Sequence, residues 1–345
     1  MTQFVQGLKK TAIATAILSF SAVASATIVT SVKPLGFIAS SIADGITDTE
    51  VLVPAGASPH DYSLKPSDVQ KLKSAEMVVW IGEDVDAFLD KSIDDLDYKK
   101  VLTIKDIAAI EPFLLKGEHH HHHHGEGEVH EDHDHAHEGH HHDHEKHEHK
   151  HEEHDHKHEH AGHEHHHDHD HEDLGINWHV WYSPDISKSV AQRIAAKLVK
   201  QYPEKKEQIE KNVAEFNRTL DEQSAKIKTQ LESVKDKGFY VFHDAYGYFN
   251  QAYGLNQTGY FTINPLVAPG AKTLAKIKEE IAEHKVNCLF AEPQFTPKVI
   301  ESLSKGTQVN VGRLDPMGDV VKLGVNSYAA FLQFTADSYA QCLAK

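Results

Sequence analysis

One segment of this 345-residue chain cannot belong to a folded core. Between Gly117 and Asp173, histidine alternates with glutamate or aspartate, and no apolar residue recurs at the spacing of a helix or a strand. Such a segment buries too little apolar surface to offset the entropy of ordering it, so we expect it to be disordered without metal. The fold must therefore be built from the residues on either side of this insert.

The insert also holds most of the unusual composition of the chain. It contains 27 of the 31 histidines, and its 19 acidic residues against three lysines give it a net charge of −16 out of −17. The other 288 residues have a net charge of −1. No excess of basic side chains remains to neutralise phosphates, which excludes nucleic acid as a partner. The rest of the chain is a nearly neutral body, and its length allows two domains.

The N-terminus has the pattern of a secretory signal peptide. Lys9 and Lys10 precede an apolar stretch, and Ala24-Ser25-Ala26 forms a small-x-small cleavage site. The apolar stretch is shorter than the ~20 residues that a membrane span needs. We therefore expect cleavage after Ala26 and an exported protein without direct membrane insertion.

Strand-like and helix-like patterns alternate on both sides of the insert, which predicts an α/β fold of two lobes with mostly parallel sheets. The predicted strands are 27–32, 50–53, 77–81 and 101–104 before the insert, and 239–242, 259–262, 287–291 and 308–311 after it. The predicted helices are 34–43, 67–74, 84–94, 246–253, 272–284, 296–304 and 327–343. The domains predicted are a signal peptide (1–26), an N-terminal lobe (27–182, including the insert 117–173), a helical linker (183–237) and a C-terminal lobe (238–345).

The linker contains the longest helical pattern in the sequence. Pro203 divides it, because proline lacks a backbone donor and clashes inside a helix. The part after Pro203 is long enough for one rigid helix of ~45 Å that spans both lobes. A helical hairpin packed on one lobe is the alternative.

Four histidines lie outside the insert, and three of them follow predicted strands. His60 lies in a Pro/Gly loop, His179 lies directly after the insert, and His243 ends the strand 239–242. In open α/β sheets the binding crevice lies beyond the carboxyl ends of the strands. Neutral imidazoles are zinc ligands, so these three predict a metal site in a common cleft at the strand ends. His284 lies near the end of a predicted helix and is interpreted as structural.

Cys288 and Cys342 are the two cysteines, an even number in a chain predicted to be exported to an oxidising compartment. Cys288 lies in a predicted buried strand and Cys342 near the end of the last helix. We expect a disulfide between them. Two buried free thiols are the alternative.

Four sequence segments resemble the metal-receptor cluster of ABC-transporter solute-binding proteins, and within it the periplasmic zinc receptors. They are Gly56-Ala-Ser-Pro-His60-Asp-Tyr-Ser-Leu-Lys-Pro-Ser67, Val241-Phe-His243-Asp-Ala-Tyr-Gly-Tyr-Phe249, Phe290-Ala-Glu-Pro-Gln-Phe295 and Leu314-Asp-Pro-Met-Gly318. The resemblance extends over essentially the whole mature chain. It implies two α/β lobes joined by a long rigid helix, with one metal ion between them.

The resemblance also implies a ligand set. By motif, the ligands are His60, His179 and His243, and Asp315 occupies the fourth position of the wider family. Some zinc receptors have a glutamate directly before the first histidine, but that position here is Pro59. Whether Asp315 or water completes the site is open. Three imidazoles favour zinc, whereas more carboxylates would favour manganese. We interpret Glu292 as a supporting carboxylate, and the aromatic residues near the motifs as cleft walls or core: Trp178, Trp181, Tyr62, Tyr246 and Phe249.

Dense imidazole and carboxylate groups in the insert predict several weaker zinc sites, because binding there must also order the chain. Collecting zinc, buffering it and docking a partner are all open roles. The secondary ligands predicted are His119, His120, His121, His122, His133, His135, His147 and His149.

The predicted function is capture of Zn²⁺ in the periplasm and its delivery to the permease and ATPase of a zinc ABC importer, without catalysis. We expect a monomer, and we expect binding to weaken below about pH 6.5, where imidazoles protonate. The alternatives are a manganese receptor of the same fold, a zinc hydrolase with a three-histidine site, and a storage protein in which only the insert matters.

Overall fold

The computed structural model describes residues 27–116, 175–262, 265–295, 298–305 and 307–345. The described segments before and after the insert, up to Leu115 and from Asn177, form one compact unit. The predicted signal peptide and all the insert histidines lie outside the described residues. The predicted domain boundaries stay a prediction, because both sheets belong to this one unit.

The N-terminal lobe is built on a four-stranded sheet in the order β2-β1-β3-β4, with every pairing parallel. The strand β3 consists of buried apolar residues and β1 is almost entirely buried, as expected for parallel strands covered on both faces. All four strands predicted from the sequence are present, with ends shifted by one or two residues. Their bounds are β1 (Thr27–Thr30), β2 (Asp48–Val51), β3 (Met77–Trp80) and β4 (Val101–Thr103).

The C-terminal lobe repeats this topology, with the order β6-β5-β7-β8 and parallel pairing throughout. In both sheets the first strand lies between the second and the third. The connections therefore leave in opposite directions from the first strand, and this switch point is where ligands bind in open α/β sheets. The bounds are β5 (Phe239–His243), β6 (Gln257–Thr262), β7 (Cys288–Ala291) and β8 (Asn310–Arg313).

Most of the predicted helices are confirmed, and one is broken. The helix predicted over 84–94 forms three short pieces, because Asp86 leaves helical geometry at φ −104° and ψ 39°. Its carboxylate accepts hydrogen bonds from Ser31 Oγ at 2.6 Å and Ile81 N at 2.8 Å, which ties it to the ends of β1 and β3. The α-helices are α1 (Lys33–Ile42), α2 (Pro66–Ser74), α3 (Glu83–Asp86), α4 (Asp90–Asp94), α5 (Pro184–Gln201), α6 (Lys206–Leu231), α7 (Gly247–Tyr253), α8 (Ala271–Ala282), α9 (Lys298–Ser304) and α10 (Ser327–Leu343). The 3-10 helices are η1 (Ala87–Leu89), η2 (Ile104–Asp106), η3 (Ala108–Phe113), η4 (Val180–Tyr182) and η5 (Pro203–Lys205).

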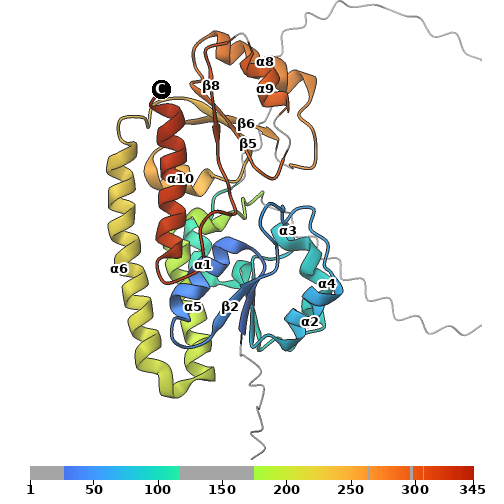
Figure 1. Ribbon diagram of the computed structural model, residues 1–345, viewed down its shortest axis with the longest axis vertical. Coiled ribbons are helices and arrows are strands. Elements are labelled where there is room, and N and C mark those ends of the chain that lie inside the picture. Colours follow the sequence, from blue (N-terminus) through green and yellow to red (C-terminus); the bar gives the residue numbers. More distant parts are fainter. Residues whose placement is uncertain (1–26, 117–174, 263–264, 296–297, 306) are drawn as a thin grey trace, which may run out of the picture. The chain divides into compact units, whose positions relative to one another are not determined.

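The helix α6 joins the two lobes. Pro203 separates α5 from α6, as predicted, and the 26 residues of α6 span about 39 Å at 1.5 Å per residue. It packs on α1 of the N-terminal lobe and on α7 and α10 of the C-terminal lobe (Figure 1). α5 packs along α6, so a hairpin is also present, but α6 reaches beyond it into both lobes. The predicted long spanning helix is confirmed.

A disulfide joins Cys288 in β7 to Cys342 in α10, with 6.1 Å between their Cα atoms. This confirms the predicted bridge. It closes a loop of 54 residues and fixes the last helix to the C-terminal sheet.

Candidate metal centre

His243 and Glu292 lie at the switch point of the C-terminal sheet. His243 is the last residue of β5, and Glu292 directly follows β7, the strand beside it. The Glu292 carboxylate lies 2.7 and 2.9 Å from His243 Nδ1 and also accepts a hydrogen bond from Tyr246 Oη at 3.1 Å. Both His243 and Glu292 are buried, so this contact fixes the orientation of the imidazole.

His60 is carried by the loop between β2 and α2. The backbone of this loop is folded by short-range hydrogen bonds, from Ala57 N to Pro54 O at 3.2 Å and from Asp61 N to Ser58 O at 3.4 Å. The Ser58 hydroxyl also accepts from His60 N at 3.2 Å. The loop therefore presents His60 from an ordered turn in the N-terminal lobe.

His179 comes from the short segment between the insert and η4. The amide of Asn177 accepts from His179 N at 3.1 Å and contacts His179 Nδ1 at 2.8 Å through its Oδ1. Its Nδ2 donates to the Asp244 carbonyl at 2.7 Å, which sets the amide so that Oδ1 faces the histidine. Asp244 directly follows His243, so Asn177 couples the positions of two of the histidines.

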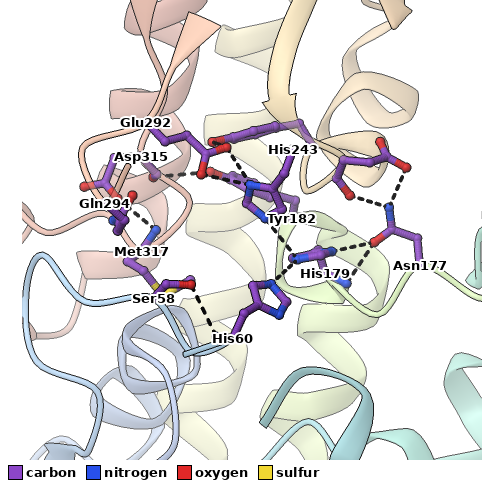
Figure 2. Close-up of polar contacts among 12 residues, drawn as sticks. Ser58, His60, Asn177, His179, Tyr182, His243, Glu292, Gln294, Asp315 and Met317 are labelled. Atoms are coloured by element: carbon purple, nitrogen blue, oxygen red, sulfur yellow. Dashed lines mark hydrogen bonds and ion pairs between the residues drawn. The ribbon is translucent and has the colours of Figure 1, made fainter. Parts of the chain in front are cut away.

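The three imidazoles meet at their Nε2 atoms (Figure 2). His179 Nε2 lies 3.3 Å from His60 Nε2 and 3.3 Å from His243 Nε2. Among the described residues, these three form a group whose possible ligand atoms all lie within 4.8 Å of one another. Ligand nitrogens about 2.0–2.1 Å from a tetrahedral zinc ion would be about 3.3–3.4 Å apart, so the spacing fits one such ion.

The hydrogen bonds at Nδ1 determine what the Nε2 atoms can do. A carboxylate and an amide oxygen only accept, so Nδ1 of His243 and of His179 must carry the proton and donate. In the neutral rings, Nε2 of both histidines then presents a lone pair, and these lone pairs face each other. That arrangement is unfavourable by itself and becomes favourable around a cation.

Burial keeps the rings of His60 and His179 uncharged. Burial lowers the pKa of His60 to about 4, with a further contribution from His243. Burial, followed by the proximity of His243 and His60, holds the pKa of His179 well below its usual value. Neutral imidazole is the metal-binding form of histidine, so the site is prepared for a metal ion at neutral pH.

The family model of the periplasmic zinc-uptake complex component A, ZnuA, matches residues 28–342 of the chain. The chain belongs to the ZnuA family. The match includes both lobes, all three histidines and the disulfide.

Relatives in the ZnuA family are similar over their full length. The high-affinity zinc uptake system protein ZnuA of Haemophilus influenzae is 70% identical over 338 residues, which cover 98% of this chain and 99% of the relative. The protein of the same description from Yersinia pestis is 40% identical and covers 97% and 98%.

Solved structures share the fold. A crystal structure of ZnuA superposes with a TM-score of 0.65 at 21% identity, covering 91% of this chain and 99% of the other. The periplasmic zinc-binding protein TroA from Treponema pallidum gives a TM-score of 0.69 at 17% identity, covering 93% and 100%. The two-lobed α/β architecture is thus that of the ZnuA family and of TroA.

Asp315, the fourth residue predicted for the site, lies near the histidines but outside their cluster. Its Oδ1 accepts from Gln294 Nε2 at 2.9 Å and from Met317 N at 3.0 Å, and its Oδ2 accepts from Asp319 N at 2.7 Å. Figure 2 shows Asp315 beside Gln294 and Met317, away from His60. In this ZnuA-family chain, both Asp315 oxygens are therefore engaged by the turn that follows β8.

The cavity at the histidines is small, with a volume of about 10 Å³. Pockets for small organic molecules are typically about 300–1,000 Å³, so the space suits an ion better than an organic substrate. Two larger concavities, one beside α5 and one beside β8 and α10, contain none of the three histidines. The cavity is lined by Ser58, Pro59, His60, His179, Trp181, His243, Glu292, Gln294, Phe295, Pro316 and Met317.

Of the five aromatic residues considered as cleft walls, Trp181 lines this cavity. Tyr246 is buried with its hydroxyl on Glu292, and Phe249 stacks on Tyr339 at 5.4 Å. The Tyr62 hydroxyl donates to Asp68, and Trp178 packs on the main core. The other four therefore do not line the cavity, and they support neighbouring residues or belong to the core.

Sequence reasoning missed Asn177 and Gln294. The pattern Asn-x-His gives a signal for Asn177, because asparagine commonly hydrogen-bonds to the backbone two residues later. Gln294 lies within a segment that resembles the family, but its contact with Asp315 joins residues 21 positions apart and leaves no local pattern.

No helix among the described residues is long and apolar enough to cross a membrane. His284 lies outside the metal centre, as predicted. It is exposed and follows the end of α8 in a left-handed conformation with φ 58°.

Because the pKa of His60 is lowered by burial, the stability of the metal-free protein at acid pH tests whether this side chain is buried. The unfolded chain protonates histidine below about pH 6.5, whereas folded His60 resists protonation down to about pH 4. The unfolded state thus binds more protons in this window, so the metal-free protein should lose stability as pH falls from 6.5 to 4. Replacing His60 with glutamine should make the melting temperature of the metal-free protein fall less steeply there. An unchanged slope would show that His60 is not buried in this way.

Proposed function

We propose that this chain captures one Zn²⁺ ion between its two lobes and delivers it to a membrane importer. The proposed ligands are the Nε2 atoms of His60, His179 and His243. The observation that carries this proposal is that His179 Nε2 lies 3.3 Å from each of the other two Nε2 atoms, while oxygen acceptors hold Nδ1 of His179 and His243. Hydrogen bonds from the second ring nitrogen to a carboxylate or carbonyl are typical of zinc-binding histidines.

The ligand chemistry supports zinc over manganese. Imidazole suits zinc, and carboxylate and water oxygens suit manganese. Asp315 is engaged by three hydrogen-bond donors, and Glu292 faces Nδ1 of His243 rather than the Nε2 cluster. Among the described residues, the site therefore offers three nitrogen ligands and no free carboxylate, which is why we do not favour the manganese receptor.

For the fourth position we propose water rather than Asp315. Two buried polar atoms of cavity-lining residues have no hydrogen-bond partner, Trp181 Nε1 and Gln294 Oε1. One is a donor and the other an acceptor. A metal-bound water in this cavity would have polar partners there, and Asp315 would act by fixing the Gln294 amide.

Delivery requires partners outside this chain. The ZnuA family is described as the periplasmic component of a zinc-uptake complex. We propose that this chain, exported after cleavage behind Ala26, works as a monomer and passes zinc to the permease and ATPase of an ABC importer. Coordination alone accounts for this role, and the small cavity supports an ion rather than the substrate of a zinc hydrolase as its occupant.

We propose that the insert binds further zinc weakly and is not needed for tight binding. Deleting residues 117–173 should remove the weaker binding events and leave the tightest one unchanged, because all three proposed ligands lie outside it. Titration of both proteins with zinc by calorimetry tests this. Loss of the tightest event in the deletion would favour the storage protein instead.

A competition titration tests the proposed function itself. Protein stripped of metal should take one equivalent of zinc from a chelator of known affinity, and a large excess of manganese should not displace it. Displacement by equimolar manganese would favour the manganese receptor. No uptake of zinc from any chelator would contradict the proposal.

A further inference from the structure

A turn of the C-terminal lobe is organised around Asp315. Besides the contacts of its carboxylate with Met317 N and Asp319 N, its carbonyl accepts from Gly318 N at 3.2 Å. Gly318 has a φ of 61°, and a side chain there would meet the Phe331 ring at 2.5 Å. The turn is therefore closely packed, and it holds Asp319 in a defined position.

From this turn, Asp319 contacts the N-terminal lobe at two points. Its Oδ2 accepts a hydrogen bond from Gly56 N at 2.6 Å. Its carbonyl accepts from Lys33 Nζ at 2.6 Å, at the start of α1. One residue of the C-terminal lobe is thus tied to the loop after β2 and to the first helix.

The contact at Gly56 acts on the loop that carries His60. Gly56 is four residues before His60, and the hydrogen-bonded turn around Ser58 lies between them. Gly56 has a φ of 79°, a left-handed conformation that aims its N–H at Asp319. A displacement of His60 away from the other two imidazoles would have to move this loop against the Asp319 contact.

We propose that the Asp319 carboxylate is a latch that holds the His60 loop against the C-terminal lobe and slows the release of zinc. This inference rests on the proposed function. Asp319 does not touch the metal and is a positioning residue. Because His179 and His243 are held from their own side by Asn177 and Glu292, His60 is the ligand that leaves first.

Stopped-flow release of zinc to an excess of chelator tests the latch in the full chain. Asp319→Ala removes the acceptor for Gly56 N, and we expect zinc to dissociate about tenfold faster, the size expected for one hydrogen bond to a charged group. Asp319→Asn keeps an oxygen acceptor and should stay within about threefold of the wild type. Asp221→Ala is the matched control, because that carboxylate is exposed and pairs with Lys188 on the helices α5 and α6.

If Asp319 has a purely structural role, Asp319→Ala should lower the melting temperature, and Asp319→Asn should not restore it. If Asp319→Ala does not fold, Lys33→Met decides, since it removes the other tie to the same turn and should also speed release. Dissociation within twofold of the wild type in a folded Asp319→Ala, or in Lys33→Met when the first does not fold, overturns the latch. Such a result leaves the proposed function standing, whereas a wild-type protein that retains no zinc refutes that function directly.

Discussion

Replacing His243 with asparagine is expected to lower the zinc affinity of the tight site by more than about 100-fold, because loss of an outer hydrogen-bond partner alone costs about 10–100-fold. His243 is buried at the end of β5, where no other described side chain can supply a nitrogen to the cluster. Asparagine keeps an N–H for Glu292 but has no imidazole. Competition with a zinc chelator measures the loss.

The matched control is the same substitution at His284. That histidine is exposed and has a φ of 58°, a conformation that asparagine tolerates better than most residues. His284→Asn should therefore change neither folding nor zinc affinity. An unaffected His243→Asn, or an equal loss in both variants, would contradict the assignment of the metal centre.

The second large effect is expected at Glu292. Glu292→Gln keeps the shape of the side chain but removes the negative charge beside His243 Nδ1, and we expect a loss of zinc affinity of about 10–100-fold. The charge matters because it stabilises the proton on Nδ1, which leaves Nε2 free for the metal. Chelator competition at pH 7 measures this change.

Tyr246→Phe separates the effect of the Glu292 charge from that of the hydrogen bonds around it. The Tyr246 hydroxyl donates to Glu292 Oε1 at 3.1 Å, so this variant loses one hydrogen bond of the carboxylate and keeps its charge. Its loss of affinity should be clearly smaller than that of Glu292→Gln. Equal effects would mean that the hydrogen-bond network, rather than the charge, supports His243.

The fold was predictable because the inner strands of both sheets are short, mostly apolar and buried. Strands such as β3 and β5 are buried along their whole length, and this pattern is visible as apolar runs between helical segments. The break between α5 and α6 was also predictable, because Pro203 by itself disfavours a continuous helix. The helix predicted over 84–94 failed because Asp86 bonds to Ser31, 55 residues earlier, and no local pattern encodes that contact.

Part of the candidate metal centre was predictable from the sequence, and part of it was not. His60, His179 and His243 were predictable as histidines at strand ends or beside the insert, since the sheet topology brings such positions together. The state of Asp315 was not predictable, because it depends on Gln294 and on the backbone of its own turn. The low pKa of His60 also depends on burial and on His243, so protons should compete for this ligand at a lower pH than the free imidazole value suggests.

Anomalous diffraction at the zinc edge tests the central claim most directly. Crystals of the full chain prepared with one equivalent of zinc should show their strongest anomalous peak among His60, His179 and His243, about 2.0–2.1 Å from each Nε2. Asp315 should remain on Gln294 and its own turn. A strongest peak elsewhere, or zinc bound by the Asp315 carboxylate in place of one of the three imidazoles, would contradict the proposed site.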